Sequence, residues 1–241
     1  MAFSRGPSIV TDGLVLALDA ANHKSYPGSG TTWYDLITGI TFTPDNNTPV
    51  FNTSGIAYVD FEASSNPGDN LKSTSGYSGI NTQNEYTRMA WFNHESDSSF
   101  RPIIGNSIGN NIDMGLSILN SKLHFRQYTN TYNSGTTPGD YGVDGTSTFN
   151  TGTWNHGVIV VNRSAQSLKI YLNGELDKST SINLIGNSTS TTVMIGGPDS
   201  DSYAGARMYD GKVASVMHYS RELSASEIQQ NYNATKSRFG L

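Results

Sequence analysis

The apolar residues of this chain fall in short segments, several of which alternate with polar residues at the period of two that is typical of β-strands. In 122–128, Leu123 and Phe125 share one face, and the polar residues share the other. No apolar segment approaches the roughly 18–20 residues that span a bilayer. Strands are expected at 13–19, 57–61, 87–92, 113–119, 122–128, 154–162, 167–172, 193–196 and 212–219.

Two dipeptides between these segments have the composition of tight hairpin turns. Asn120-Ser121 separates two alternating segments, and Asn173-Gly174 follows another. A type I′ turn needs a positive φ at both central residues, and Asn-Gly adopts it most readily. About ten to twelve strands joined in this way predict an all-β fold, an antiparallel β-sandwich or jelly roll.

One helix is expected near the C-terminus, at about 225–233. Ser224 and Glu227 have the spacing of a capping box, in which each side chain bonds to the other residue's backbone N–H. Leu223 and Ile228 occupy the two positions of a hydrophobic staple. The fold class is therefore a β-sandwich with one short C-terminal helix.

The composition limits the classes of function. Ser, Thr, Asn and Gly together supply 103 of the 241 residues, which favours turns and short strands over long helices. The net charge of −5 argues against a nucleic-acid-binding face, because phosphate recognition needs clustered Lys and Arg. The absence of cysteine excludes disulfides and thiolate chemistry. Because no linker divides the chain, residues 11–241 are expected to form a single domain, preceded by residues 1–10.

An ordered series of short motifs runs along this domain, at 11–22, 32–36, 154, 170–174, 195–197, 210–214 and 219–224. The series resembles the laminin G-like domains of the concanavalin A-like lectin/glucanase superfamily. It is similar to those found in virion structural proteins of tailed phages, notably marine, cyanophage-like ones. The resemblance implies a concanavalin A-like sandwich and a calcium ion at a sheet edge. The superfamily hosts lectins, hydrolases, adhesins and virion components, so the fold alone does not fix the function.

Acidic residues in two loops are candidate calcium ligands. Asp199 and Asp201 stand in a polar loop after Gly196-Gly197-Pro198, and Asp69 lies in another loop beside Asn70. Calcium prefers hard oxygen ligands, and carboxylates with backbone carbonyls of one loop supply several of them. The alternative is an ordinary solvated Asp/Ser turn.

Tyrosines in polar loops are candidate ligand contacts, because the ring offers apolar area with a polar tip. They either stack on sugar rings or pack at a subunit interface, where Tyr is also enriched. The candidates are Tyr128, Tyr132, Tyr141, Tyr203 and Tyr209.

The sequence predicts no catalytic site. Retaining glycosidases need two carboxylates about 5–5.5 Å apart, whereas the six Glu residues are scattered along the chain. The five histidines show neither a metal-ligand spacing nor the context of a catalytic triad. His124 and His218 stand in alternating segments and are expected to be surface or half-buried residues.

Residues 1–10 have no periodicity and are expected to form an arm outside the sandwich. Phe3, Arg5 and Pro7 suit an extended segment that orders when it binds a capsid or tail partner. The alternative is that the arm packs on its own sandwich. The arm would dock the domain so that loops 129–153 and 197–210 face outward.

Two classes of function follow from these observations. The first is a non-enzymatic phage virion protein, a capsid decoration or a tail or fibre component, whose outward domain assists adhesion to host surface glycans. It would contact other virion proteins, form homo-oligomers on the particle, and bind neither nucleic acid nor membrane. The N-terminal residues lack the apolar core of a signal peptide, which favours a virion protein made in the host cytoplasm. The second class is a separate carbohydrate-binding lectin or glycoside hydrolase.

Overall fold

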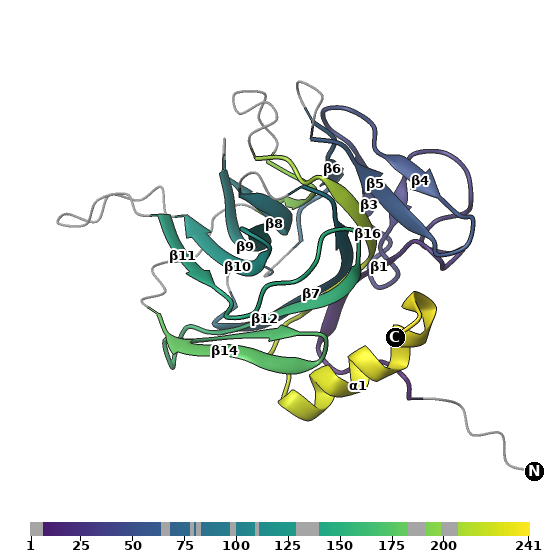
Figure 1. Cartoon of the computed structure of the whole chain (residues 1–241). Coiled ribbons are helices and arrows are strands. Elements are labelled where there is room, and N and C mark those ends of the chain that lie inside the picture. The colour runs from purple at the N-terminus through teal and green to yellow at the C-terminus, as the bar shows by residue number, and fades with distance from the viewer. Residues whose placement is uncertain are drawn as a thin grey trace, which may run out of the picture.

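Two antiparallel sheets form the body of the protein, as the sequence predicts. The computed structural model describes residues 7–63, 68–77, 80, 83–96, 100–108, 111–128, 140–182, 191–198 and 207–241. Within these residues the strands pack as two layers, and one helix follows the last strand (Figure 1). The all-β sandwich with a single short C-terminal helix is therefore confirmed.

The first layer, sheet A, has the strand order β14-β13-β12-β7-β16-β5-β4, and β1 also pairs with β16. Every pair is antiparallel, and β7 and β12 stay in register over nine residue pairs from Trp154–Asn93 to Asn162–Glu85. The strands are β1 (Leu14–Asp19), β4 (Val50–Asn52), β5 (Tyr58–Phe61), β7 (Glu85–His94), β12 (Trp154–Asn162), β13 (Ser167–Leu172), β14 (Glu175–Ser181) and β16 (Gly211–Tyr219).

The second layer, sheet B, has the order β11-β10-β9-β8-β15-β6-β3-β2. Several of its strands are only two to four residues long, and they alternate in sequence with strands of sheet A. The strands are β2 (Trp33–Tyr34), β3 (Thr41–Pro44), β6 (Leu71–Ser73), β8 (Arg101–Ile108), β9 (Asn111–Leu119), β10 (Lys122–Tyr128), β11 (Asp140–Asp144) and β15 (Val193–Ile195).

The two expected hairpin turns join β9 to β10 and β13 to β14. Asn120 and Ser121 have φ values of 52° and 55°, and Asn173 and Gly174 have values of 52° and 84°. These positive values are the type I′ conformation that matches the twist of the flanking strands. Both turn predictions are confirmed.

The core lies between the inner faces of the two sheets. Phe92 and Ile159 of sheet A and Leu116 and Phe125 of sheet B belong to one cluster of buried apolar side chains. Each of the four is completely buried. Burial of aromatic and branched side chains is the main favourable term in the stability of such a sandwich, at about 25 cal/mol per Å² of apolar area.

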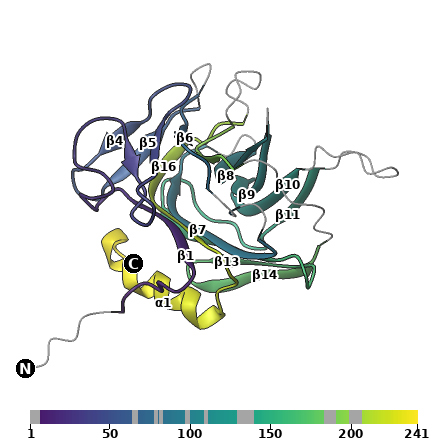
Figure 2. The ribbon, with the colours of Figure 1, turned by 180° about the vertical axis from the view of Figure 1, so that it is seen from behind.

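The helix α1 (Ala225–Thr235) covers the outer face of sheet A and continues into a 3-10 turn, Lys236–Phe239. Met89, Tyr219 and Ile228 form a second apolar cluster there. Phe239 stacks on Trp91, with ring centroids 4.0 Å apart. Because these contacts cover both faces of β7 and β16, the sandwich gains a third layer on this side, which Figures 1 and 2 show from opposite directions.

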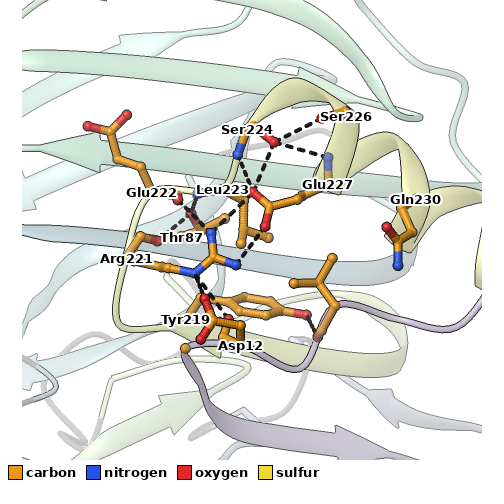
Figure 3. Close-up of polar contacts among 12 residues, drawn as sticks. Asp12, Thr87, Tyr219, Arg221, Glu222, Leu223, Ser224, Ser226, Glu227 and Gln230 are labelled. Carbon is orange, nitrogen blue, oxygen red and sulfur yellow. Dashed lines mark hydrogen bonds and ion pairs between the residues drawn. The ribbon is translucent and has the colours of Figure 1, made fainter.

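The capping box at the start of α1 is present as expected. Glu227 accepts a hydrogen bond from the Ser224 backbone N–H at 2.8 Å, and the Ser224 hydroxyl accepts one from the Glu227 N–H at 3.3 Å. Arg221 joins this group to the N-terminal part of the chain, because it contacts both Glu227 and Asp12 (Figure 3). The first turn of the helix is thereby held both by its own capping box and by the Arg221 contact that leads to Asp12.

Candidate functional site

A pocket of about 310 Å³ opens on the outer face of sheet B, at strands β9 to β11. Its volume lies at the lower end of the range of small-molecule sites, about 300–1,000 Å³, and suits a ligand the size of one sugar residue. Three of its side chains carry or can accept positive charge. The lining residues are Phe100, Leu119, His124, Arg126, Gly142 and Arg207.

The alternation of β10 places the two central side chains in this pocket. Leu123 and Phe125 point into the core, so His124 and Arg126 project from the opposite face of the strand. Arg126 is nevertheless only 3% exposed. Its guanidinium carbon lies 4.4 Å from the centre of the Phe100 ring, a cation–π arrangement that holds the guanidinium in place.

His124 is held by a partner on the neighbouring strand. Its Nδ1 lies 2.6 Å from the Asp144 carboxylate, and the register of β10 and β11 sets these two residues opposite each other. The imidazole also meets the Phe100 ring edge to face, with centroids 5.6 Å apart. The imidazole ring of His124 lies over Gly142, where a Cβ would collide with it. Gly142 is therefore required for the position of His124.

Segments far apart in the sequence meet at this pocket. Gly142 and Asp144 belong to the predicted ligand loop 129–153, and Arg207 belongs to the predicted loop 197–210. Phe100, Leu119 and two β10 residues, His124 and Arg126, complete the lining. The pocket combines cationic side chains with the apolar surfaces of Phe100 and Leu119, so it can hold a polar or anionic ligand that also has an apolar face.

Four of the five candidate tyrosine side chains and two of the arm residues cannot be placed against this pocket. Tyr132, Tyr203, Phe3 and Arg5 lie outside the described residues, as does the side chain of Tyr128. For Tyr141 only the backbone is described, in β11, where it pairs with Gln127 of β10. Tyr128 likewise has a described backbone, at the end of β10 opposite Asp140.

The fifth tyrosine, Tyr209, is not a loop contact but a core residue. It is completely buried, and its ring packs edge to face on Phe61 and stacks on His94. The expectation of an exposed Tyr209 is therefore wrong. The reason is that the polar segment before β16 turns inward between the sheets before the strand begins at Gly211.

The predicted positions of His124 and His218 are also wrong, because both residues are buried. His218 Nδ1 accepts a hydrogen bond from Arg88 Nε at 3.0 Å, and its Nε2 lies 3.0 Å from Gln83 Oε1. Burial, with the charge of Arg88, holds the pKa of His218 well below its usual value. Both faces of β16 are covered, so the alternation of this strand does not mark a solvent-facing side.

Of the candidate calcium ligands, the structure describes only Asp69 with its neighbour Asn70; Asp199 and Asp201 lie outside the described residues. Asp69 is buried and accepts a hydrogen bond from the Glu62 backbone N–H at 3.0 Å. Asn70 accepts from Asn46 N–H and donates to the Pro198 oxygen. Asp69 therefore lies beside the segment that leads into Asp199. No group of three or more His, Asp or Glu side chains that could hold a metal ion occurs among the described residues.

The N-terminal segment packs on its own domain from residue 8 onward. Val10 N–H donates to Asn231 Oδ1 at 2.7 Å, and the Tyr219 hydroxyl donates to the Val10 oxygen at 2.8 Å. Gln230 donates to the Ser8 oxygen at 2.7 Å. Residues 8–10 thus belong to the sandwich rather than to an arm outside it, while Pro7 is exposed.

The comparison with family models identifies one match. A model described as the concanavalin A-like lectin/glucanases superfamily matches residues 64–229. No protein with a curated description matches the chain. In the described part of the chain no helix is both long and apolar enough to cross a membrane.

Several solved structures share the fold. The binding domain of botulinum neurotoxin DC, in complex with rat synaptotagmin II, has a TM-score of 0.67 and 15% identity over 92% of this chain and 51% of its own. A structure on the cell entry of botulinum neurotoxin type C, which depends on two ganglioside molecules, has a TM-score of 0.66 and 13% identity over 92% and 51%. The serotype D binding domain has a TM-score of 0.65 and 20% identity over 93% and 52%. The chain therefore spans about half the length of these structures, and the likeness is one of fold.

Proposed function

The chain belongs to the concanavalin A-like lectin/glucanases superfamily, and from that membership we propose that it is a non-catalytic, lectin-like binding domain of a phage particle. Its pocket on sheet B binds glycans of the host surface. Its N-terminal residues attach it to a capsid or tail partner, as a capsid decoration protein or a tail or fibre component. In this proposal the protein is made in the host cytoplasm and joins the virion in several copies.

The observation that carries the proposal is the position of the pocket relative to the N-terminal segment. The pocket opens on the outer face of sheet B, whereas Ser8 and Val10 lie against α1 on the outer face of sheet A. Figures 1 and 2 show α1 and strands β10 and β11 on opposite sides of the molecule. A domain attached through its N-terminal residues would therefore present the pocket outward, away from the particle.

The chemistry of the pocket supports binding rather than hydrolysis. Glycoside hydrolysis needs two carboxylates on either side of the scissile bond. Among the described side chains, the Asp144 carboxylate lies beside the pocket, and it is already paired with His124. Hydrolysis of a polysaccharide by the purified protein, lost when Asp144 is changed to Asn, would replace the binding proposal by a hydrolase.

The motif series of the sequence supports the assignment to a phage particle. Incorporation of a shortened protein into particles tests this assignment. Residues 2–7 are the segment to delete, because Ser8 and Val10 contribute to the packing of the domain. We expect the shortened protein to fold normally and to be absent from purified particles. Incorporation at the copy number of the intact protein would show that this segment is not the anchor.

A variant that fills the pocket tests ligand binding. Leu119 is half-buried at its rim, and Leu119→Trp adds volume there without changing charge. We expect this variant to lose binding to the glycans that the intact protein retains from a panel of neutral and acidic polysaccharides. Leu176→Trp, on the exposed strand β14 of the other sheet, is the matched control. Equal binding by the Leu119→Trp variant would exclude this pocket as the site.

A calcium ion held by Asp69 together with Asp199 and Asp201 is a further part of the proposal. The contact of Asn70, the neighbour of Asp69, with the Pro198 oxygen supports it, since Pro198 directly precedes Asp199. Asn70 does not fit as a ligand, because its Oδ1 accepts from Asn46 and its amide donates to Pro198. The ion would tie the loop after β15 to the loop before β6 and so contribute stability.

A further inference from the structure

The pocket on sheet B brings together basic side chains of a protein whose net charge is negative. The chain carries a net charge of −5, yet Arg126, Arg207 and His124 all line this one pocket. The other lining residues, Phe100, Leu119 and Gly142, carry no charge, and the Asp144 carboxylate beside the pocket is paired with His124. A cationic pocket on an acidic protein concentrates the field where the ligand binds, while the remaining surface repels polyanions.

We propose that the pocket selects acidic glycans, with the anionic group of one sugar residue held between Arg126 and Arg207. This inference rests on the proposed function, because it names the class of glycan that the same pocket binds. Arginine suits the role because its planar fork of N–H donors matches the oxygens of carboxylate and sulfate groups. A carboxylate or sulfate adds charge–charge attraction to its hydrogen bonds with the guanidinium, and a neutral hydroxyl does not, so a neutral sugar would bind less tightly.

The pocket is already arranged for such a ligand. The Phe100 ring packs on Arg126, whose guanidinium carbon lies 4.4 Å from the ring centre, and meets His124 edge to face. Asp144 fixes His124 through Nδ1 at 2.6 Å, and the neighbouring Gly142 leaves room for the imidazole. Side chains held in position before binding lose less conformational entropy when the ligand arrives, which increases affinity.

The apolar part of the pocket fits a sugar ring. Leu119 and Phe100 lie in the same lining as the two arginines. A sugar residue presents C–H groups on one face and polar substituents around its rim, so it can contact both kinds of side chain at once. An inorganic anion would use the arginines alone. The combination therefore favours an acidic sugar residue over a simple anion.

The test measures the affinity of the intact protein for three polysaccharides. Polygalacturonate carries carboxylates, dextran sulfate carries sulfates, and dextran is neutral. We expect at least one acidic polymer to bind about tenfold or more tightly than dextran. Arg207→Gln is the main variant, because Arg207 is half-buried, whereas Arg126 lies deeper and Arg126→Gln needs a melting curve beside it. Both variants should weaken acidic binding about tenfold.

Two comparisons separate the possible outcomes. Lys169→Gln removes one partly exposed cation from sheet A and should leave acidic binding unchanged; a loss equal to that of Arg207→Gln would show general charge attraction and overturn the inference. Binding of dextran as tightly as the acidic polymers, sensitive to Leu119→Trp but not to Arg207→Gln, would also overturn it while the proposed function stands. Binding of none of the three polymers by the intact protein would contradict the proposed function itself.

Discussion

Arg221 and Glu227 face each other across the start of α1, with Nη2 of the arginine 2.6 Å from Oε1 of the glutamate. The same glutamate accepts the Ser224 backbone N–H, and the same arginine contacts Asp12 near the N-terminal end of the described chain. These contacts connect the helix cap, the last strand and the segment before β1 (Figure 3). A change that breaks these contacts is therefore expected to destabilise both the segment around Asp12 and the first turn of the helix.

The first prediction concerns the charge of Glu227. Its hydrogen bond with Arg221 lowers its pKa to about 2, below the ordinary 4.5. A lowered folded-state pKa stabilises the protein above pH 4.5, and the contribution is lost as the pH falls from there toward 2. We expect Glu227→Gln to cost about 1 kcal/mol at pH 7, the usual worth of a helix cap and a partly exposed ion pair.

Urea unfolding at pH 7 and pH 3 measures this contribution. The difference between the intact protein and the Glu227→Gln variant should shrink at the lower pH. Glu175→Gln, an exposed glutamate on β14, is the control and should change the free energy of unfolding little at either pH. A difference that stays the same at both pH values would contradict the role of the charge.

The second prediction concerns His156, which lies under α1 between Trp91 and Tyr232. Complete burial lowers its pKa to about 3, so the folded protein keeps this imidazole neutral while the unfolded chain takes up a proton near pH 6.5. Stability should therefore fall as the pH drops below about 6.5, by up to about 1.4 kcal/mol per pH unit. Between pH 6 and pH 4, the His156→Phe variant should take up about one proton fewer on unfolding than the intact protein. Its free energy of unfolding should therefore depend less steeply on pH. An unchanged slope would show that His156 is not the titrating group.

Much of the fold follows from the sequence because its signals are local. The Asn173-Gly174 turn and the Ser224/Glu227 capping box depend on a few adjacent residues, and the structure has both. The short strands β2, β3, β4 and β6 have only two to four residues, too few to show a period, so they were not expected as separate strands. Their pairing is decided by contacts with distant strands, such as Phe42 of β3 opposite Ser73 of β6.

The site was harder to predict because its residues come together only in the folded chain. The composition of the two loops that reach the pocket indicates a ligand site, but nothing in the sequence points to Phe100, Arg126 or Arg207. Arg126 is one of several polar residues on an alternating strand, and nothing local shows that Phe100 covers it. His218 was placed at the surface for a related reason, since its alternation gives no sign that α1 and sheet B cover both faces of β16.

The third prediction concerns calcium. An ion that binds only the folded state stabilises it by RT ln(1 + [L]/Kd), about 2.7 kcal/mol at a hundredfold excess over Kd. We expect millimolar calcium to raise the melting temperature relative to chelator, and Asp69→Asn to reduce that increase. Magnesium, which demands a smaller octahedral site, is the control ion and should have less effect. Equal melting temperatures with calcium and chelator would exclude the site.

The last prediction concerns Tyr209, whose hydroxyl is buried without a hydrogen-bond partner among the described residues. A buried hydroxyl that makes no hydrogen bond costs about 1–3 kcal/mol relative to an apolar group of the same shape. Tyr209→Phe should therefore leave the free energy of unfolding unchanged or raise it, whereas Tyr209→Ala, which empties the space beside Phe61 and His94, should lower it by about 3–5 kcal/mol. Glycan binding by the Tyr209→Phe variant should equal that of the intact protein, because the side chain does not reach the pocket lining. If Tyr209→Phe lost glycan binding without losing stability, Tyr209 would be part of the ligand site. If Tyr209→Phe lowered the free energy of unfolding by more than about 1 kcal/mol, its hydroxyl would have a hydrogen-bond partner.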